Sequence, residues 1–274
     1  MGIKSTGYLA CLLPLTLMST FVPASNGSAT DAGHAVDLAL VLAADVSSSM
    51  TQVEVALQRD GYADALLSPS VLAAIRSGAH KRIAVTYLEW SGEGMAQIVV
   101  KWTLLDTGAS VEQVAETIRS FVAEPSRRSR AGRTSISYAL RYSSYQFRSL
   151  PWQAERRVID ISGDGINNDG EEVEPARAEA LGSRITINGL PIGNGVNGGE
   201  PLSDYYARAV IGGDNAFIEP VASLRDFEIA MERKLQREIA NLDGNMIGLA
   251  GGKLASRGPT PDDDLREEIV ALIR

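Results

Sequence analysis

The sequence predicts an α/β fold with a doubly wound, mostly parallel, Rossmann-like sheet flanked by helices and one antiparallel edge strand. Three observations lead to this prediction. Residues 36–44 are continuously apolar apart from Asp37, as expected for a central strand that is covered on both faces. Short β-rich runs then alternate with segments whose apolar residues recur at helical spacing. The turn Ser91-Gly92-Glu93-Gly94 joins two of these runs into a hairpin.

The first half of the domain supplies three of the strands and two of the helices. The β-rich runs predict strands at residues 36–44, 82–90 and 95–104, the last of them at the sheet edge. The helical spacing of apolar residues predicts helices at residues 52–67 and 110–122. Pro69 is expected to close the first of these helices, and Ser110 is expected to be the N-cap of the second.

The second half of the domain continues the alternation of strands and helices. Helices are expected at residues 135–147, 172–182, 201–210 and 223–240. Strands are expected at residues 157–162, 185–192 and 216–221. In such sheets ligands bind beyond the carboxyl ends of the strands. The side chains that follow the strands at 36–44 and 157–162 are therefore expected to lie close together.

Residues 1–24 have the pattern of a secretory signal peptide. Lys4 is their only charged residue, an apolar stretch runs from Tyr8 to Val22, and Val22-Pro23-Ala24 offers the small residues that signal peptidase reads. We therefore expect cleavage after Ala24, or alternatively after Ala29, and a periplasmic or secreted protein. The alternative is an uncleaved leader that anchors the chain in a membrane, which Pro14 and the short apolar core disfavour.

Two further segments flank the predicted domain at residues 36–240. Residues 25–35 are small and polar and are expected to form an N-terminal tail. Residues 241–274 contain several glycines and the segment Pro259–Asp264, which indicate a flexible C-terminal extension that ends in a short helix.

The composition excludes several classes of function. The chain has 34 acidic and 26 basic residues, with a formal net charge of −8, which argues against nucleic acid because its binding needs a basic face. The only cysteine, Cys11, lies in the predicted leader, so the mature chain would have neither a disulfide nor thiol chemistry. No segment after the leader approaches the roughly 20 apolar residues of a membrane span.

The segment Asp45-Val46-Ser47-Ser48-Ser49 directly follows the first predicted strand. Read at alternate positions it gives Asp-x-Ser-x-Ser, which places one carboxylate and two hydroxyls at the end of that strand. Carboxylate and hydroxyl oxygens are hard ligands of the kind that Mg²⁺, Mn²⁺ and Ca²⁺ prefer. The alternative interpretation is an ordinary solvated loop between a strand and a helix, because serine is common in turns.

Two later segments share this chemistry. In Gly132-Arg133-Thr134-Ser135-Ile136, Thr134 follows a glycine-bearing loop and opens a predicted helix. In Asp160-Ile161-Ser162-Gly163-Asp164-Gly165, Asp164 stands between two glycines after a predicted strand. The three motifs in this order resemble the metal-ion-dependent adhesion site (MIDAS) of von Willebrand factor type A (VWA) domains, and the resemblance covers roughly residues 36–240.

The resemblance implies a VWA-like sheet with one divalent cation, Mg²⁺ or alternatively Mn²⁺ or Ca²⁺. By the family pattern, the ion is contacted directly or through water by Asp45, Ser47, Ser49 and Thr134, and Asp164 completes the site. Three further strings resemble an uncharacterised bacterial family of exported A-domain proteins, a resemblance that implies no known activity: Thr86–Gly92, Ile161–Asn168 and Ile187–Ile192.

The functional expectation is a non-catalytic, exported module that binds a protein partner. In A domains the ion characteristically holds a carboxylate of that partner. One alternative is a metal-dependent hydrolase on the same sheet, with Glu89 as a candidate base because it lies near the end of the second strand. Against it, His34 and His80 do not follow strands, and the chain has no nucleophile motif. A second alternative is a metal that serves stability alone.

Overall fold

The computed structural model describes residues 1–2, 35–123, 133–193, 196–197 and 199–240. Contacts along the chain divide it into two units, residues 1–33 and residues 34–274, and only Met1 and Gly2 of the first unit are described. The predicted signal peptide and the C-terminal extension at 241–274 thus lie outside the described residues, apart from Met1 and Gly2. They stay predictions.

A five-stranded sheet forms the centre of the second unit. Its strand order is β4-β3-β2-β6-β7, and every neighbouring pair is parallel except β3 with β4. This arrangement confirms the predicted mostly parallel sheet with one antiparallel edge strand. The strands are β2 (Leu38–Asp45), β3 (Ile83–Trp90), β4 (Ala96–Leu105), β6 (Arg157–Gly163) and β7 (Thr186–Pro191).

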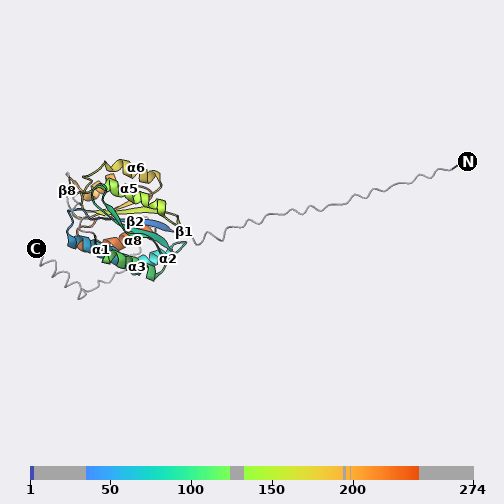
Figure 1. Cartoon of the computed structure of the whole chain (residues 1–274), viewed down its shortest axis with the longest axis horizontal. Helices are drawn as coiled ribbons and strands as arrows, with labels where there is room; N and C mark the ends of the chain where they lie inside the picture. Colours follow the sequence, from blue (N-terminus) through green and yellow to red (C-terminus); the bar gives the residue numbers. More distant parts are fainter. Residues whose placement is uncertain (3–34, 124–132, 194–195, 198, 241–274) are drawn as a thin grey trace. The chain divides into compact units, whose positions relative to one another are not determined.

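Helices cover both faces of this sheet. Figure 1 shows α5 (Ile136–Gln146) and α6 (Val173–Gly182) on one face. The other face is covered by α1 (Gln52–Leu67), α2 (Pro69–Ser77), α3 (Gly108–Ser120) and α8 (Phe227–Ala240). The smaller elements are β1 (Ala35–Val36), β5 (Gln153–Ala154), β8 (Val196–Asn197), β9 (Glu200–Pro201), α7 (Leu202–Tyr205), and the short turns η1 (Phe147–Ser149), η2 (Tyr206–Val210) and η3 (Leu224–Asp226).

Strand β2 explains why the sheet needs cover on both sides. All eight of its residues are buried. Leu40 and Leu42 belong to the core under α1, α2, α3 and α8, whereas Val41 and Ala43 belong to the core under α5 and α6. Successive side chains of a strand point to opposite faces, so an uninterrupted apolar run fills both cores. Among the helices that the structure describes, none combines the length and apolarity needed to cross a membrane.

The first predicted strand is divided at Asp37. Val36 belongs to β1 and pairs with Ala154 of β5, and β2 begins at Leu38. The Asp37 carboxylate accepts hydrogen bonds from the backbone N–H groups of His80 (2.9 Å) and Arg82 (3.3 Å). The one charged residue of the run is therefore used to fix the loop before β3.

The sequence prediction omits helix α2. Ser68 ends α1 and is also the N-cap of α2, where its hydroxyl accepts from Val71 N at 3.3 Å. Pro69 then occupies the first position of α2, where a backbone N–H is not needed. Pro69 closes the first helix as predicted, but it opens a second helix as well.

The predicted N-cap of α3 is wrong by one turn. Thr107, not Ser110, is the N-cap: its hydroxyl accepts from Ser110 N at 3.2 Å. The Ser110 hydroxyl accepts in return from Thr107 N at 3.2 Å. This reciprocal capping box starts the helix at Gly108, two residues before the predicted start.

The predicted last strand, residues 216–221, forms only isolated bridges with β7. Glu219 N donates to Gly189 O at 2.9 Å, and Val221 N donates to Pro191 O at 3.0 Å. Pro191 has no backbone N–H, so it cannot donate a hydrogen bond back to residues 216–221. The segment is extended along the sheet edge without forming a regular sixth strand.

Candidate metal centre

The Asp-x-Ser-x-Ser segment and Asp164 lie at the same edge of the sheet. Asp45 is the last residue of β2, and Asp164 directly follows β6. The two strands are parallel neighbours, with Ala44 opposite Ser162. Their carboxyl ends therefore meet, which is the edge where ligands bind in open α/β sheets.

Hydrogen bonds connect the motif residues directly. Asp45 Oδ1 accepts from Ser47 N at 2.7 Å, and the Ser47 and Ser49 hydroxyls are 3.1 Å apart. The Ser49 hydroxyl donates to Asp164 Oδ1 at 2.8 Å. Asp45 and Ser47 are buried, whereas Ser49 is exposed, so the group opens to solvent on one side.

Thr134 joins the same group from the loop before α5. Its backbone N donates to Asn168 Oδ1 and its carbonyl accepts from Asn168 N, both at 2.9 Å. A Cβ built on Gly165, the neighbour of Asp164, would lie 3.6 Å from Thr134 Oγ1. All five residues predicted from the sequence are therefore brought together at this edge.

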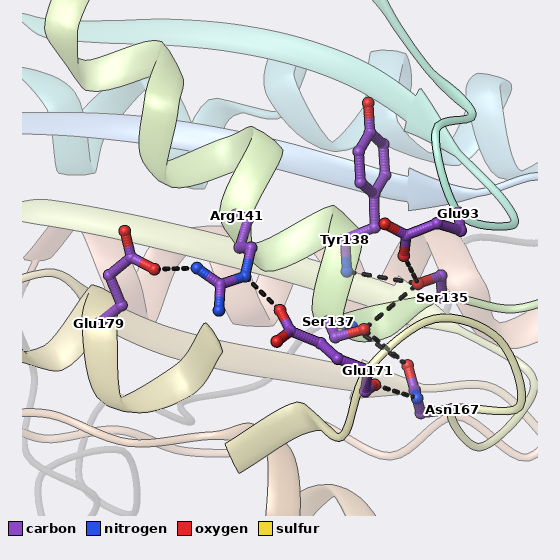
Figure 2. A network of polar contacts seen from close by, with 8 residues as sticks. All are labelled: Glu93, Ser135, Ser137, Tyr138, Arg141, Asn167, Glu171 and Glu179. Atoms are coloured by element: carbon purple, nitrogen blue, oxygen red, sulfur yellow. Dashed lines mark hydrogen bonds and ion pairs between the residues drawn. The ribbon is translucent and has the colours of Figure 1, made fainter. Parts of the chain in front are cut away.

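A polar network fixes the loop that carries Asp164 against the start of α5 (Figure 2). Asn167 Oδ1 accepts from Ser137 N at 3.1 Å, and Asn167 Nδ2 donates to Glu171 O at 2.9 Å. Ser135 caps α5 by accepting from Tyr138 N at 3.4 Å. Arg141 pairs with the carboxylate of Glu171, and with that of Glu179 in α6.

The side-chain oxygens of this loop are thus used to hold the loop itself. Asp169 Oδ2 accepts from Glu93 N at 2.8 Å, in the turn between β3 and β4. Together with Asn167 and Asn168, Asp169 therefore ties three loops together. In a calcium loop these side-chain oxygens would point toward an ion, whereas here they accept hydrogen bonds from backbone N–H groups.

The end of β2 is also fixed through its backbone. Gln58 Nε2, on α1, donates to Asp45 O at 2.9 Å. The Ser162 hydroxyl donates to Gln58 Oε1 at 3.2 Å and accepts from the Tyr62 hydroxyl at 2.9 Å. This chain of buried hydrogen bonds links β2, α1 and β6, so the position of Asp45 does not depend on its side-chain contacts.

The Asp45 carboxylate is the buried charge of the site. Burial, and to a smaller extent the nearby Asp164 carboxylate, raise its pKa from 3.8 to about 7. Burial likewise raises the pKa of Asp164. Asp45 Oδ2 is buried and has no hydrogen-bond partner among the described residues. A cation would satisfy this oxygen and offset the repulsion between the two carboxylates, so the residues present fit a divalent ion.

Two residues of the site escape the sequence prediction. The Tyr206 hydroxyl is buried without a hydrogen-bond partner in the described structure. A Cβ built on Gly163 would lie 2.7 Å from this hydroxyl and 3.0 Å from Asp45 Oδ2, so Gly163 keeps the space between the two orphaned atoms open.

Tyr206 reaches this position through an irregular helix. The predicted helix at 201–210 consists of α7 and a π turn, η2, in which Ile211 N donates to Tyr206 O at 3.0 Å. Such π turns occur frequently at functional sites. No local signal in the sequence indicates the π turn, and Tyr206 is far from the three motifs along the chain.

Glu89, the candidate base, is already paired. Its two oxygens accept from Arg59 Nε at 2.6 Å and Arg59 Nη2 at 2.8 Å, and both side chains are buried. Arg59 also donates to Phe121 O at 2.6 Å. His80 contacts Glu155 at 3.2 Å, and His34 lies outside the described residues. Glu89 is thus engaged by Arg59, and His80 precedes β3, at the end of the sheet away from this centre.

The candidate ligands of this centre include hydroxyls as well as carboxylates. Within the described part of the chain, no group of three or more His, Cys, Asp or Glu side chains stands close enough to hold a metal ion. Two carboxylates and three hydroxyls are an oxygen-only ligand set, which suits hard cations and leaves thiolate- or imidazole-preferring metals without their usual ligands.

Solved structures similar to this chain have the VWA fold. Proximal thread matrix protein 1 from the mussel byssus, with a zinc-occupied MIDAS motif, is 15% identical over 76% of this chain and 48% of that chain, with a TM-score of 0.55. The pilus adhesin SpaC from Lactobacillus rhamnosus GG is 13% identical over 75% of this chain and 30% of that chain, with a TM-score of 0.55.

A von Willebrand factor type A structure from Catenulispora acidiphila is 14% identical over 74% of this chain and 43% of that chain, with a TM-score of 0.52. This chain thus spans half or less of the length of these proteins. The likenesses confirm the VWA-like fold that the motifs predicted, and at such low identity they show the fold alone.

Among curated proteins no similar sequence is found. One family model matches residues 35–243, which is more than half of the chain and includes all five motif residues. The match begins and ends close to the limits of the domain predicted at 36–240. The chain therefore belongs to the family described as Protein of unknown function (DUF1194).

Proposed function

We propose that this chain is an exported, divalent-cation-dependent module that binds a protein partner through an acidic group of that partner. The observation that carries the proposal is Asp45 Oδ2, a buried carboxylate oxygen without a partner among the described residues, in the middle of a cluster of hydroxyls. The VWA fold and the adhesin SpaC among the similar structures support a role in binding.

In this proposal Asp45, Ser47, Ser49, Thr134 and Asp164 hold one Mg²⁺, or alternatively Mn²⁺ or Ca²⁺. The ion supplies a Lewis-acidic coordination position that an oxygen of the partner can fill. The protein's own residues do the positioning. Ser47 N fixes one oxygen of Asp45, and the network around Asn167 and Asn168 fixes Thr134 and Asp164.

The pairing of Glu89 favours binding over hydrolysis. A hydrolase needs a base within reach of a reacting water. Glu89 is held by Arg59 through two hydrogen bonds, and breaking them would leave a buried arginine without its counter-charge. The acidic surface of the chain, with a net charge of −8, means that attraction of an acidic partner must come from the ion.

Metal binding is tested by titration calorimetry of the mature chain with Mg²⁺, Mn²⁺ and Ca²⁺. We expect one site with micromolar to millimolar affinity, roughly −8 to −4 kcal/mol, because few of its ligands are charged. Asp45→Ala and Thr134→Ala should weaken binding strongly. Ser48→Ala is the matched control, since Ser48 is out of phase with the motif and exposed. Equal affinity in the wild type and Asp45→Ala would contradict the site.

Partner binding is tested by affinity capture from a periplasmic extract, with Mg²⁺ or with chelator. We expect a protein that is retained with the ion, released by chelator, and lost with Asp45→Ala and Thr134→Ala while both variants stay folded. If the ion is retained and stabilises the fold but no protein depends on it, the metal is structural and the binding role is wrong. Turnover of a phosphate or peptide substrate that is lost in Glu89→Gln while this variant stays folded would show a hydrolase instead.

Export is proposed from residues 1–24 and is tested separately. The chain is expressed from its first codon in a Gram-negative host, and the N-terminus of the product outside the cytoplasm is sequenced. We expect it to begin near Ser25, after the predicted cleavage site. A product that begins at Met1 would show that the leader is not cleaved.

A further inference from the structure

A cavity lies at the end of the sheet opposite the candidate metal centre. Its volume is about 390 Å³, within the range of small-molecule sites. Arg157 and Thr186, which begin β6 and β7, are part of its lining. Asp164 follows the other end of β6, so strand geometry separates the two places by roughly 20 Å.

Four arginines line this cavity: Arg156, Arg157, Arg184 and Arg237. No ion pair of theirs is found among the described residues. Arg156 donates to two backbone carbonyls of α8, Glu238 O at 2.8 Å and Ile239 O at 2.9 Å, which anchors it without neutralising it. Arg157 and Arg184 are exposed at the rim.

The acidic residues of the lining offset these charges only in part. Glu155 contacts His80 at 3.2 Å, and Glu238 pairs with Lys234. Asp214 is the remaining carboxylate of the lining. The chain has a net charge of −8, so four arginines around one cavity are a local concentration of positive charge, which an anion would neutralise.

Arg237 is held in place by an aromatic ring. The centre of its guanidinium lies 3.8 Å from the centroid of the Phe217 ring, a cation–π contact. Its Nε is buried and has no hydrogen-bond partner within the described structure. A guanidinium fixed in this way loses little freedom when it binds a carboxylate or phosphate through paired N–H donors.

Glu238 adds an acceptor to the cavity. Its side chain is fully buried, and Oε1 accepts from Asn188 Nδ2 at 2.9 Å. Oε2 is buried and has no hydrogen-bond partner among the residues described. Behind it Lys234 Nζ pairs with Asp160 at 2.8 Å, and both of these side chains are fully buried. The lining therefore combines guanidinium donors with one unsatisfied carboxylate oxygen.

We propose that this cavity binds a small organic anion that carries a carboxylate or phosphate group together with an N–H or O–H donor. The oxyanion is held by Arg157, Arg184 and Arg237, and the donor meets Glu238 Oε2. A ligand without the donor would bring its negative charge toward an unsatisfied carboxylate, which weakens binding. The site is independent of the candidate metal centre and of the function proposed for it.

The test uses three probes with the mature chain in chelator: inorganic phosphate, succinate and L-aspartate. Succinate and L-aspartate form a matched pair, because both carry two carboxylates and only L-aspartate has an ammonium group. We expect saturable binding of L-aspartate by calorimetry at micromolar to low-millimolar concentration. Succinate should bind several-fold more weakly, since it offers nothing to Glu238.

The double variant Arg157→Gln and Arg184→Gln should weaken L-aspartate binding at least tenfold. Both side chains are exposed, so the fold should persist. Arg208→Gln is the control: it removes the charge of one arginine near the other end of the sheet, where Arg208 pairs with Glu200, and should leave binding unchanged. Absence of saturable binding for all three probes, or undiminished binding in the double variant, would overturn the proposal. Succinate binding as tight as L-aspartate would refute the role of Glu238.

Discussion

Replacing Asp45 by asparagine removes the buried charge of the candidate centre while keeping the shape of the side chain. Asparagine can still accept the hydrogen bond from Ser47 N through Oδ1, and its amide nitrogen takes the place of the orphaned Oδ2. In the absence of a metal ion, we expect the Asp45→Asn variant to be more stable than the wild type. The gain reflects the free energy that the wild type loses by keeping this carboxylate ionised and buried.

The magnitude follows from the pKa of Asp45, which burial and Asp164 raise from 3.8 to about 7. Because the pKa is raised in the folded state, the unfolded chain releases the proton first as the pH increases. The stability of the wild type therefore falls between about pH 4 and pH 7. The wild type loses folding free energy on the order of 4 kcal/mol at pH 8, and about 2 kcal/mol of this loss is already present at pH 5.

The assay is urea unfolding of both proteins at pH 5 and pH 8 in chelator, followed by the same measurements with Mg²⁺. Comparing the two proteins cancels the contribution of other groups, such as Asp160, whose pKa is also raised to about 7. The free energy of unfolding of the variant should exceed that of the wild type by about 4 kcal/mol at pH 8 and by about 2 kcal/mol at pH 5. Mg²⁺ at a hundredfold excess over its Kd should stabilise the wild type by about 2.7 kcal/mol and the variant hardly at all.

Two results would refute this reasoning. If Asp45→Asn is less stable than the wild type in chelator at pH 8, the ionised carboxylate is favourably solvated and not an unsatisfied buried charge. If Mg²⁺ stabilises both proteins equally, the ion binds elsewhere.

Three further substitutions probe the surroundings of the centre. Glu89→Gln leaves the buried charge of Arg59 without its partner and should destabilise the fold by about 3–5 kcal/mol in chemical unfolding; a loss below about 1 kcal/mol would contradict the buried pair. Tyr206→Phe removes an unsatisfied buried hydroxyl, so metal-free stability should stay equal or rise by about 1 kcal/mol, whereas a clear loss would reveal a hidden partner. Gly163→Ala should weaken Mg²⁺ binding in calorimetry because its Cβ would fill the space beside Tyr206, and Gly182→Ala, with open space around it, is the control; equal affinities in the two would count against that crowding.

The arrangement of the sheet and the five motif residues could be predicted because their causes are local. A continuous apolar run specifies a doubly covered strand, and the polar residues that follow parallel strands must meet at the carboxyl edge. Tyr206 could not be predicted because it depends on a π turn. Hydrogen bonding to the fifth residue along the chain is rare and leaves no periodic pattern in the sequence.

The misassigned elements have a different origin, since their residues allow two local structures. Pro69 ends one helix and starts the next. In the sequence, only the length of the apolar pattern after Pro69 distinguishes the end of a helix from a junction between two helices. Residues 216–221 have the composition of a strand, but their pairing depends on Pro191, a residue of the neighbouring strand. A missing donor on one strand cannot be recognised from the sequence of the other.

The candidate centre joins two segments that differ in how firmly the domain encloses them. Strand β2 is buried along its whole length and paired on both sides, so its amide protons should exchange with solvent only when the whole domain unfolds. The π turn at Tyr206–Val210 includes exposed residues and should open locally at much lower free energy. Filling the centre would therefore slow hydrogen exchange mainly in the turn, and occupancy could be followed there before any partner is known.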